Sequence, residues 1–119
     1  MCIVHDLGEA IVGDITPKDN IPKGEKYNLE FQAIKEITQT FNLHEEIIEI
    51  WQEYEENLTD EAKFVKACDK LDMGLQAILY RNKNAEFDPG EFIDSALEKI
   101  DDECMRLLVS STANGNNPL

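Results

Sequence analysis

The chain has 119 residues, of which 42% are hydrophobic, and this fits one small globular domain. It carries 25 Asp and Glu against 11 Lys and Arg, a formal net charge of -14 at pH 7. Such an acidic surface disfavours binding to nucleic-acid phosphates and to anionic membranes. No apolar stretch approaches the ~20 residues that cross a bilayer. We therefore expect neither a nucleic acid polymer nor a membrane among the partners.

The three cysteines predict a reducing environment. Cys2, Cys68 and Cys104 are odd in number, widely spaced and without a C-x-x-C pair. Structural disulfides normally occur as an even set in an oxidising compartment. We therefore expect reduced thiols in the core of a cytoplasmic protein.

Residues 1–13 carry helix-forming residues throughout, and Gly13 can end a helix there. This predicts a first helix that begins abruptly, with no capping residue before its fifth position. We interpret the abrupt start as a sign that part of the helix is missing. Asn20 is then the expected N-cap of a second helix, with Pro22 in its first turn.

Apolar residues at helical spacing predict the remaining elements. A third helix should run from Leu43 to Glu56, and a fourth from a cap at Thr59 or Asp60 to Asn82, with Phe64, Cys68 and Leu79 among its core residues. Residues 91–109 should be helical with an interruption near Asp101, and residues 110–119 should form a disordered tail. No alternating run argues for a strand, so the sequence predicts an all-α fold.

His5 and Asp6 are ionisable residues within an apolar stretch that should be largely buried. Neutral imidazole and carboxylate oxygen both bind first-row divalent metals, so one cation could partner both. The alternative is a core histidine with an ordinary partner and a solvent-facing aspartate. The residues alone do not decide between the two interpretations.

Glu9 lies one helical turn after His5, and Asp14 follows the helix end. Carboxylates beside a cation can orient water or accept a proton from it. Surface exposure of Glu9 and a simple turn role for Asp14 are the competing interpretations.

A more distant ligand could come from the fourth helix, where Asp69 and Asp72 lie on or beside the apolar face. Periodicity does not choose between them, and Asp72 is if anything nearer the core stripe. Both could equally be surface residues paired with Lys66 and Lys70.

Two segments resemble a known family. The residues from His5 to Pro17 (HDLGEAIVGDITP), followed by Glu61 to Met73 (EAKFVKACDKLDM), look like the HD-domain phosphohydrolases, and most closely their 5'-deoxynucleotidase branch. The resemblance covers roughly residues 1–82 in matching order and spacing. It implies an all-α HD-domain helical bundle, with residues 1–109 as a partial HD domain.

The resemblance also implies a site and a reaction. His5 and Asp6 match the metal-binding doublet, and Asp69 matches the later metal aspartate. Glu9 and Asp14 match the carboxylates that the family uses around the attacking water and the substrate. The implied cofactor is a divalent transition metal such as manganese or cobalt, and the implied substrate is a nucleoside 5'-monophosphate.

The chain departs from the family pattern at its start. Family members have about two helices before the doublet, which carry the first metal histidine and an arginine that grips the substrate phosphate. His44, the other histidine, has no family counterpart. We therefore expect an N-terminally truncated bundle with impaired activity, an uncovered apolar groove and self-association as a homodimer.

Two other functions stay open. One is a non-catalytic acidic helical module that binds a partner protein through the uncovered groove. The other is an HD phosphohydrolase that acts on a cyclic or polyphosphorylated nucleotide. The DITP sequence after Gly13 favours the monophosphatase branch over the latter.

Overall fold

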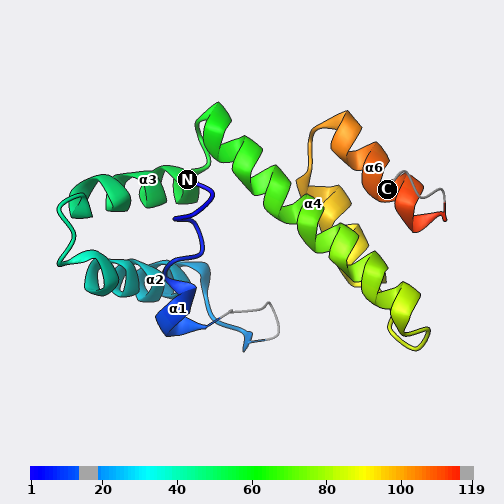
Figure 1. The fold of residues 1–119 in the computed structure, drawn as a ribbon, viewed down its shortest axis with the longest axis horizontal. Coiled ribbons are helices and arrows are strands. Elements are labelled where there is room, and N and C mark those ends of the chain that lie inside the picture. The colour runs from blue at the N-terminus through cyan, green and yellow to red at the C-terminus, as the bar shows by residue number, and fades with distance from the viewer. Residues whose placement is uncertain (14–18, 116–119) are drawn as a thin grey trace. The chain divides into compact units, whose positions relative to one another are not determined.

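The computed structural model describes residues 1–13 and 19–115, and within them it contains six helices and no strand. The predicted all-α class is therefore confirmed. The chain divides into two compact units, Met1–Ala62 and Lys63–Leu119. In chain order the helices are α1 (Glu9–Val12), α2 (Lys23–Thr38), α3 (His44–Glu56), α4 (Asp60–Lys83), α5 (Gly90–Lys99) and α6 (Glu103–Ala113) (Figure 1).

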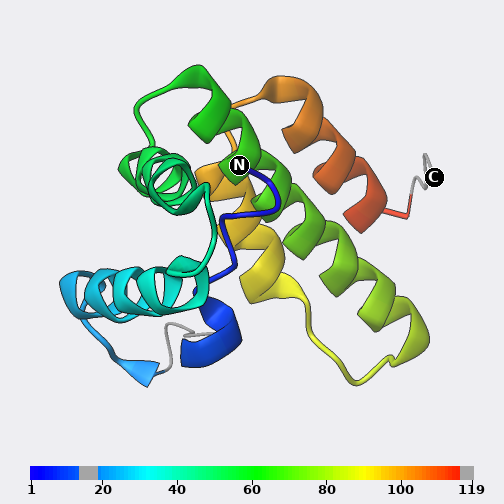
Figure 2. The same cartoon turned by 60° about the vertical axis from the view of Figure 1, so that its left-hand side comes forward.

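The first unit is built around an aromatic cluster between α2 and α3. Trp51 on α3 is completely buried, and its ring lies 5.0 Å from that of Tyr27 and 5.9 Å from that of Phe31, both on α2. Ile34 and Thr38, one and two turns further along α2, are also completely buried. This core fixes α3 against α2, and α1 packs on α2 as well (Figure 2).

The predicted first helix over residues 1–13 is wrong for its first eight residues. They form successive turns, and regular α-helix begins only at Glu9. A regular helix would pair the Cys2 carbonyl with the amide of Asp6, but this carbonyl accepts a hydrogen bond from Nδ1 of His5, at 2.6 Å. The side chain of His5 thus competes with the backbone for the same acceptor.

The predicted cap of the second helix is also wrong. Asn20 has a left-handed backbone with φ 53°, and α2 begins at Lys23 with Pro22 as the residue before it. Asparagine tolerates this turn conformation, and proline has no amide hydrogen to lose at a helix start. Pro22 therefore sets the start of α2.

The start of α4 and the interruption before α6 match the sequence prediction. The hydroxyl of Thr59 accepts a hydrogen bond from the amide of Ala62 at 3.2 Å, so Thr59 is the cap. The carboxylate of Asp102 accepts from the amide of Met105 at 2.8 Å and begins α6. The predicted interruption near Asp101 therefore separates two helices, of which the second continues past Val109 to Ala113.

The second unit has its core where α5 and α6 meet α4. Ala96, Ile100 and Val109 are completely buried, and Leu71 and Met73 of α4 pack against them. A Cβ atom on Gly74 would lie 3.1 Å from Cβ of Ala96 and 3.5 Å from Cγ1 of Val109, so glycine allows the close approach of the three helices.

Several residues predicted to be in the core lie at the surface. Phe64 and Leu79 of α4 are 60% and 47% exposed. The three cysteines are free thiols as expected, but Cys2 and Cys104 are exposed rather than buried. Across residues 1–13 and 19–115, no helix is both long enough and apolar enough to span a membrane.

Candidate metal centre

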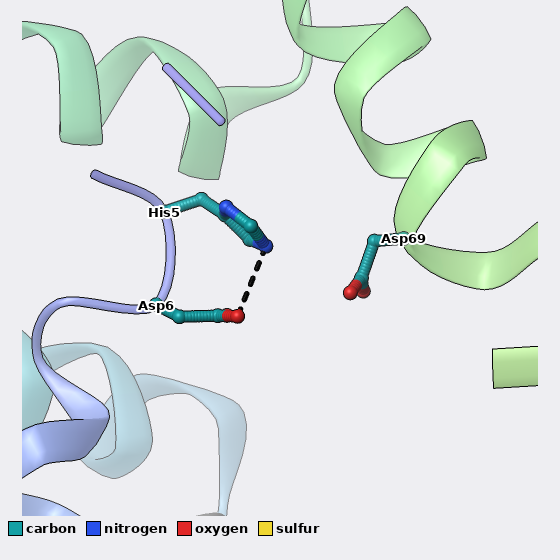
Figure 3. Close-up of side chains that lie close together, drawn as sticks. All are labelled: His5, Asp6 and Asp69. Carbon is teal, nitrogen blue, oxygen red and sulfur yellow. Dashed lines mark ion pairs between the residues drawn. The ribbon is translucent and has the colours of Figure 1, made fainter. Parts of the chain in front are cut away.

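His5 and Asp6 form a close pair in the turn that precedes α1. Nε2 of His5 lies 3.2 Å from Oδ2 of Asp6, and Figure 3 shows the two side chains facing one another. The imidazole is only 14% exposed and the carboxylate 58% exposed. The pair therefore offers one nitrogen atom from a mostly buried side chain and one oxygen atom from a solvent-exposed side chain as possible metal ligands.

The backbone fixes which nitrogen of His5 faces Asp6. Nδ1 lies 2.6 Å from the carbonyl oxygen of Cys2, and because a carbonyl can only accept, Nδ1 carries the proton. In a neutral imidazole Nε2 then holds a lone pair, as a metal ligand requires. Two electron-rich atoms 3.2 Å apart need a proton or a cation between them, and bonds of about 2.0–2.2 Å to one ion fit this separation. The pair therefore suits a divalent metal.

The imidazole of His5 is supported by an aromatic side chain of α3. The ring of Tyr54 lies 5.0 Å from it at an interplanar angle of 56°, and Tyr54 is 8% exposed. Such tilted pairs add ~0.5–1.5 kcal/mol beyond the burial of apolar area. Tyr54 thus restricts the orientation of His5.

The turn with His5 and Asp6 rests on α2 at Glu30. Gly8 is buried, and a Cβ atom on it would lie 3.0 Å from the carbonyl oxygen, 3.2 Å from Cβ and 3.3 Å from Cα of Glu30. Any larger residue would push the turn away from the helix backbone. Gly8 therefore allows the candidate ligands to lie directly over α2.

Glu30 itself is a buried carboxylate, with 5% of the residue exposed. Burial is the main reason that its pKa is raised above the ordinary 4.5, and the charges of Glu55 and Asp6 raise the pKa further. Lys26, whose Nζ lies 3.7 Å from Oε1 of Glu30, opposes the shift. The negative charge of Asp6 therefore raises the pKa of the buried Glu30 carboxylate, while the neighbouring Lys26 lowers it.

The remaining predicted residues are placed as follows. Glu9 is half-buried at the start of α1, where its amide donates to the carbonyl of Asp6 at 3.0 Å. Asp14 lies outside the described residues. Asp69, also drawn in Figure 3, projects from α4 in the second unit, half-buried and 3.8 Å from Nζ of Lys70. Asp72 on the same helix is exposed.

Sequence reasoning missed Glu30 and Tyr54. The spacing carried a signal for Glu30, because a lysine four residues earlier and Ile34 four residues later place it on the buried side of α2. Tyr54 belongs to the predicted apolar stripe of α3, but the residue spacing does not predict its contact with His5.

The HD domain family matches residues 1–107 of the chain. The chain is 43% identical to the 5'-deoxynucleotidase HDDC2 of Mus musculus over 122 residues, which cover 98% of this chain and 60% of the relative. It is 45% identical to the 5'-deoxynucleotidase HDDC2 of Homo sapiens over 115 residues, with 92% of this chain and 55% of the relative covered. The chain thus spans little more than half the length of these two relatives.

A third relative, the 5'-deoxynucleotidase HDDC2 of Dictyostelium discoideum, is 53% identical over 85 residues, which cover 70% of this chain and 45% of the relative. The family match takes in the His5-Asp6 doublet and α4, and the six helices agree with an all-helical fold. The chain therefore belongs to the HD domain family.

Proposed function

We propose that this chain carries the site of a metal-dependent phosphohydrolase that removes the phosphate of (deoxy)ribonucleoside 5'-monophosphates. The observation that carries the proposal is the His5–Asp6 pair, with Nδ1 of His5 on a carbonyl and Nε2 3.2 Å from the carboxylate. The match to the HD domain family and the similarity to proteins named 5'-deoxynucleotidase support the reaction and its substrate class.

The proposed metal ligands are His5, Asp6 and Asp69, each of which offers one ligand atom. One nitrogen and two carboxylate oxygens suit a divalent transition metal such as manganese or cobalt. A divalent cation supplies Lewis acidity, which makes water a better nucleophile near neutral pH and offsets the charge of a phosphate. The proposal that Asp69 joins the pair rests on the resemblance of the segment around it to the second family motif.

Glu9 and Asp14 are the proposed carboxylates for proton transfer. Glu9 begins α1 directly after the turn that holds Asp6, which keeps it near the candidate ligands along the chain. A carboxylate in this position can accept a proton from the attacking water and return one to the leaving nucleoside oxygen.

We also propose that the protein is a cytoplasmic homodimer. Three free thiols agree with a reducing compartment. Ile3 and Leu58, which are 90% and 74% exposed, provide apolar surface of the kind that association buries. Light scattering after size-exclusion chromatography gives the mass: twice 13.6 kDa supports the dimer, and 13.6 kDa contradicts it.

The test of the function is phosphate release from deoxynucleoside 5'-monophosphates with manganese or cobalt present. We expect activity in the wild-type chain, and a loss of at least about 100-fold in Asp6→Ala and in Asp69→Ala, because each variant loses one metal ligand. Asp72→Ala is the matched control, since it removes an exposed aspartate from the same helix.

Three outcomes separate the alternatives. Metal-dependent activity that falls in Asp6→Ala and Asp69→Ala but not in Asp72→Ala supports the proposed ligands. Equal activity in all variants contradicts the ligand assignment. No phosphate release from any monophosphate, by a wild-type chain that is folded by circular dichroism, contradicts the proposed activity of this chain.

A further inference from the structure

The least expected group in the first unit is the carboxylate of Glu30, which is buried on α2 beneath the turn that carries His5 and Asp6. A buried carboxylate costs stability unless it is well paired, and the lysine that faces it is 3.7 Å away and 39% exposed. An apolar residue would pack the same position at lower cost. Glu30 therefore invites a functional explanation.

The turn that carries His5 and Asp6 contacts α2 at Glu30. Gly8 follows Asp6 by two residues, and the closest atoms to a Cβ built on Gly8 all belong to Glu30. This contact fixes the turn over one position of α2. On the other side of the turn, α3 provides Tyr54 against the ring of His5. The backbone and Cβ of Glu30 are thus held against the turn that carries the ligand pair.

Among the described residues, the charged groups that act on Glu30 are Lys26 on the same helix, Glu55 on α3 and Asp6 in the turn. Two of these groups are carboxylates that repel the charge of Glu30, one is an ammonium that attracts it, and Glu30 itself is largely removed from solvent. Coulomb interactions are strengthened there, because the effective dielectric constant is lower than in water. A divalent cation bound by Asp6 would reduce the repulsion.

We propose that Glu30 is a positioning residue that acts through Asp6: its buried negative charge beneath the His5–Asp6 turn strengthens divalent cation binding, and Lys26 limits the effect. This inference rests on the proposed function, because it assumes that His5 and Asp6 bind a divalent cation. It adds to that function a carboxylate outside the three proposed ligands.

The experiment measures the affinity of the purified chain for Mn²⁺ by isothermal titration calorimetry at fixed pH and ionic strength. Glu30→Gln keeps the shape of the side chain and removes its charge, and we expect Mn²⁺ to bind about tenfold more weakly. Lys26→Met removes the opposing charge, and we expect Mn²⁺ to bind several-fold more tightly. Glu36→Gln, at an exposed position of the same helix, is the control and should match the wild type.

The opposite signs of the two effects distinguish a charge effect from a structural one. A residue needed only to hold α2 together would weaken Mn²⁺ binding in Glu30→Gln and in Lys26→Met alike, and this result would overturn the inference. Unchanged affinity in both variants would overturn it as well. Circular dichroism shows whether each variant is folded, and the two substitutions provide independent tests if one of them unfolds.

The wild-type titration separates this inference from the proposed function. If the wild-type chain binds Mn²⁺ and the two variants do not change in opposite directions, the role of Glu30 is wrong while the metal site stands. If the folded wild-type chain binds no Mn²⁺, both the metal site and the role of Glu30 are contradicted.

Discussion

The ring of Tyr54 lies 5.0 Å from the imidazole of His5, tilted by 56°. The hydrogen bond from Nδ1 to the carbonyl of Cys2 and the tilted contact with Tyr54 together fix where Nε2 of His5 points. The candidate ligand is thus oriented by one backbone carbonyl and one aromatic ring, both within the first unit.

Replacing Tyr54 should therefore lower the stability of the protein. Tyr54→Leu removes a buried ring, and we expect the free energy of unfolding to fall by ~1–3 kcal/mol in urea denaturation. Tyr54→Phe keeps the ring and should lose less than ~1 kcal/mol. If Tyr54→Leu and Tyr54→Phe lower the free energy of unfolding equally, the aromatic ring does not stabilise the fold through its contact with His5.

Gly8 tests the contact between the turn and α2. In Gly8→Ala the new methyl group would meet the Glu30 carbonyl oxygen at 3.0 Å, so we expect a loss of ~1–3 kcal/mol from crowding. Gly24→Ala is the control, because no atom lies within 4 Å of a Cβ at that helical position. It should be neutral or stabilise the chain by up to ~1 kcal/mol. A Gly8→Ala variant as stable as the wild type would show that the turn does not lie against α2.

Glu30 should make stability depend on pH. Its folded-state pKa is raised, mainly by burial, above the ordinary 4.5, so the folded protein binds this proton more tightly than the unfolded chain does. The resulting stabilisation is full below the unfolded pKa and is lost as pH rises through the folded pKa. Glu30→Gln cannot lose a proton, so its stability relative to the wild type should increase with pH from about 4.5 upwards.

Unfolding of the wild type and of Glu30→Gln in urea, at several pH values between about 4.5 and 8, measures this difference. Groups that do not interact with Glu30 titrate alike in both proteins and cancel in the difference, which leaves Glu30 and its coupling to Lys26, Glu55 and Asp6. The stability of Glu30→Gln relative to the wild type should rise with pH. A constant relative stability, or one that falls as pH rises, would contradict a pKa of Glu30 raised by burial.

The start of α6 depends on Asp102. Its carboxylate accepts a hydrogen bond from the amide of Met105 at 2.8 Å, and removal of such a cap costs ~0.5–2 kcal/mol. Asp102→Ala should therefore lower the free energy of unfolding by this amount. The neighbouring exposed Asp101→Ala should stay within ~0.5 kcal/mol of the wild type. The reverse order of the two effects would exclude Asp102 as the cap.

Much of the fold could be predicted from local sequence signals. The extents of α3 and α4 follow from apolar spacing and from the cap at Thr59, which are properties of a few neighbouring residues. Residues 1–8 were predicted wrongly because helix propensity does not register the bond between the imidazole of His5 and the Cys2 carbonyl. The prediction of Asn20 as an N-cap is wrong because asparagine is favoured both at N-caps and in left-handed turns, and the structure has it in such a turn.

The candidate site was predictable only in part for a similar reason. His5 and Asp6 stand out because ionisable side chains occur in an apolar stretch. Periodicity did not separate Asp69 from Asp72, which both lie near the apolar face of one helix, and the choice of Asp69 came from the family resemblance. The burial of Glu30 depends on the approach of Gly8, a contact between segments more than twenty positions apart in the sequence.

The most direct test of the proposed metal centre is the number of Mn²⁺ ions bound per chain, measured by electron paramagnetic resonance of the free ion during a titration. We predict one tightly bound ion in the wild type and in Asp72→Ala, and none in Asp6→Ala or in Asp69→Ala. Tight binding of one ion by Asp69→Ala and Asp6→Ala, as in the wild type, would contradict the assignment of these residues as ligands.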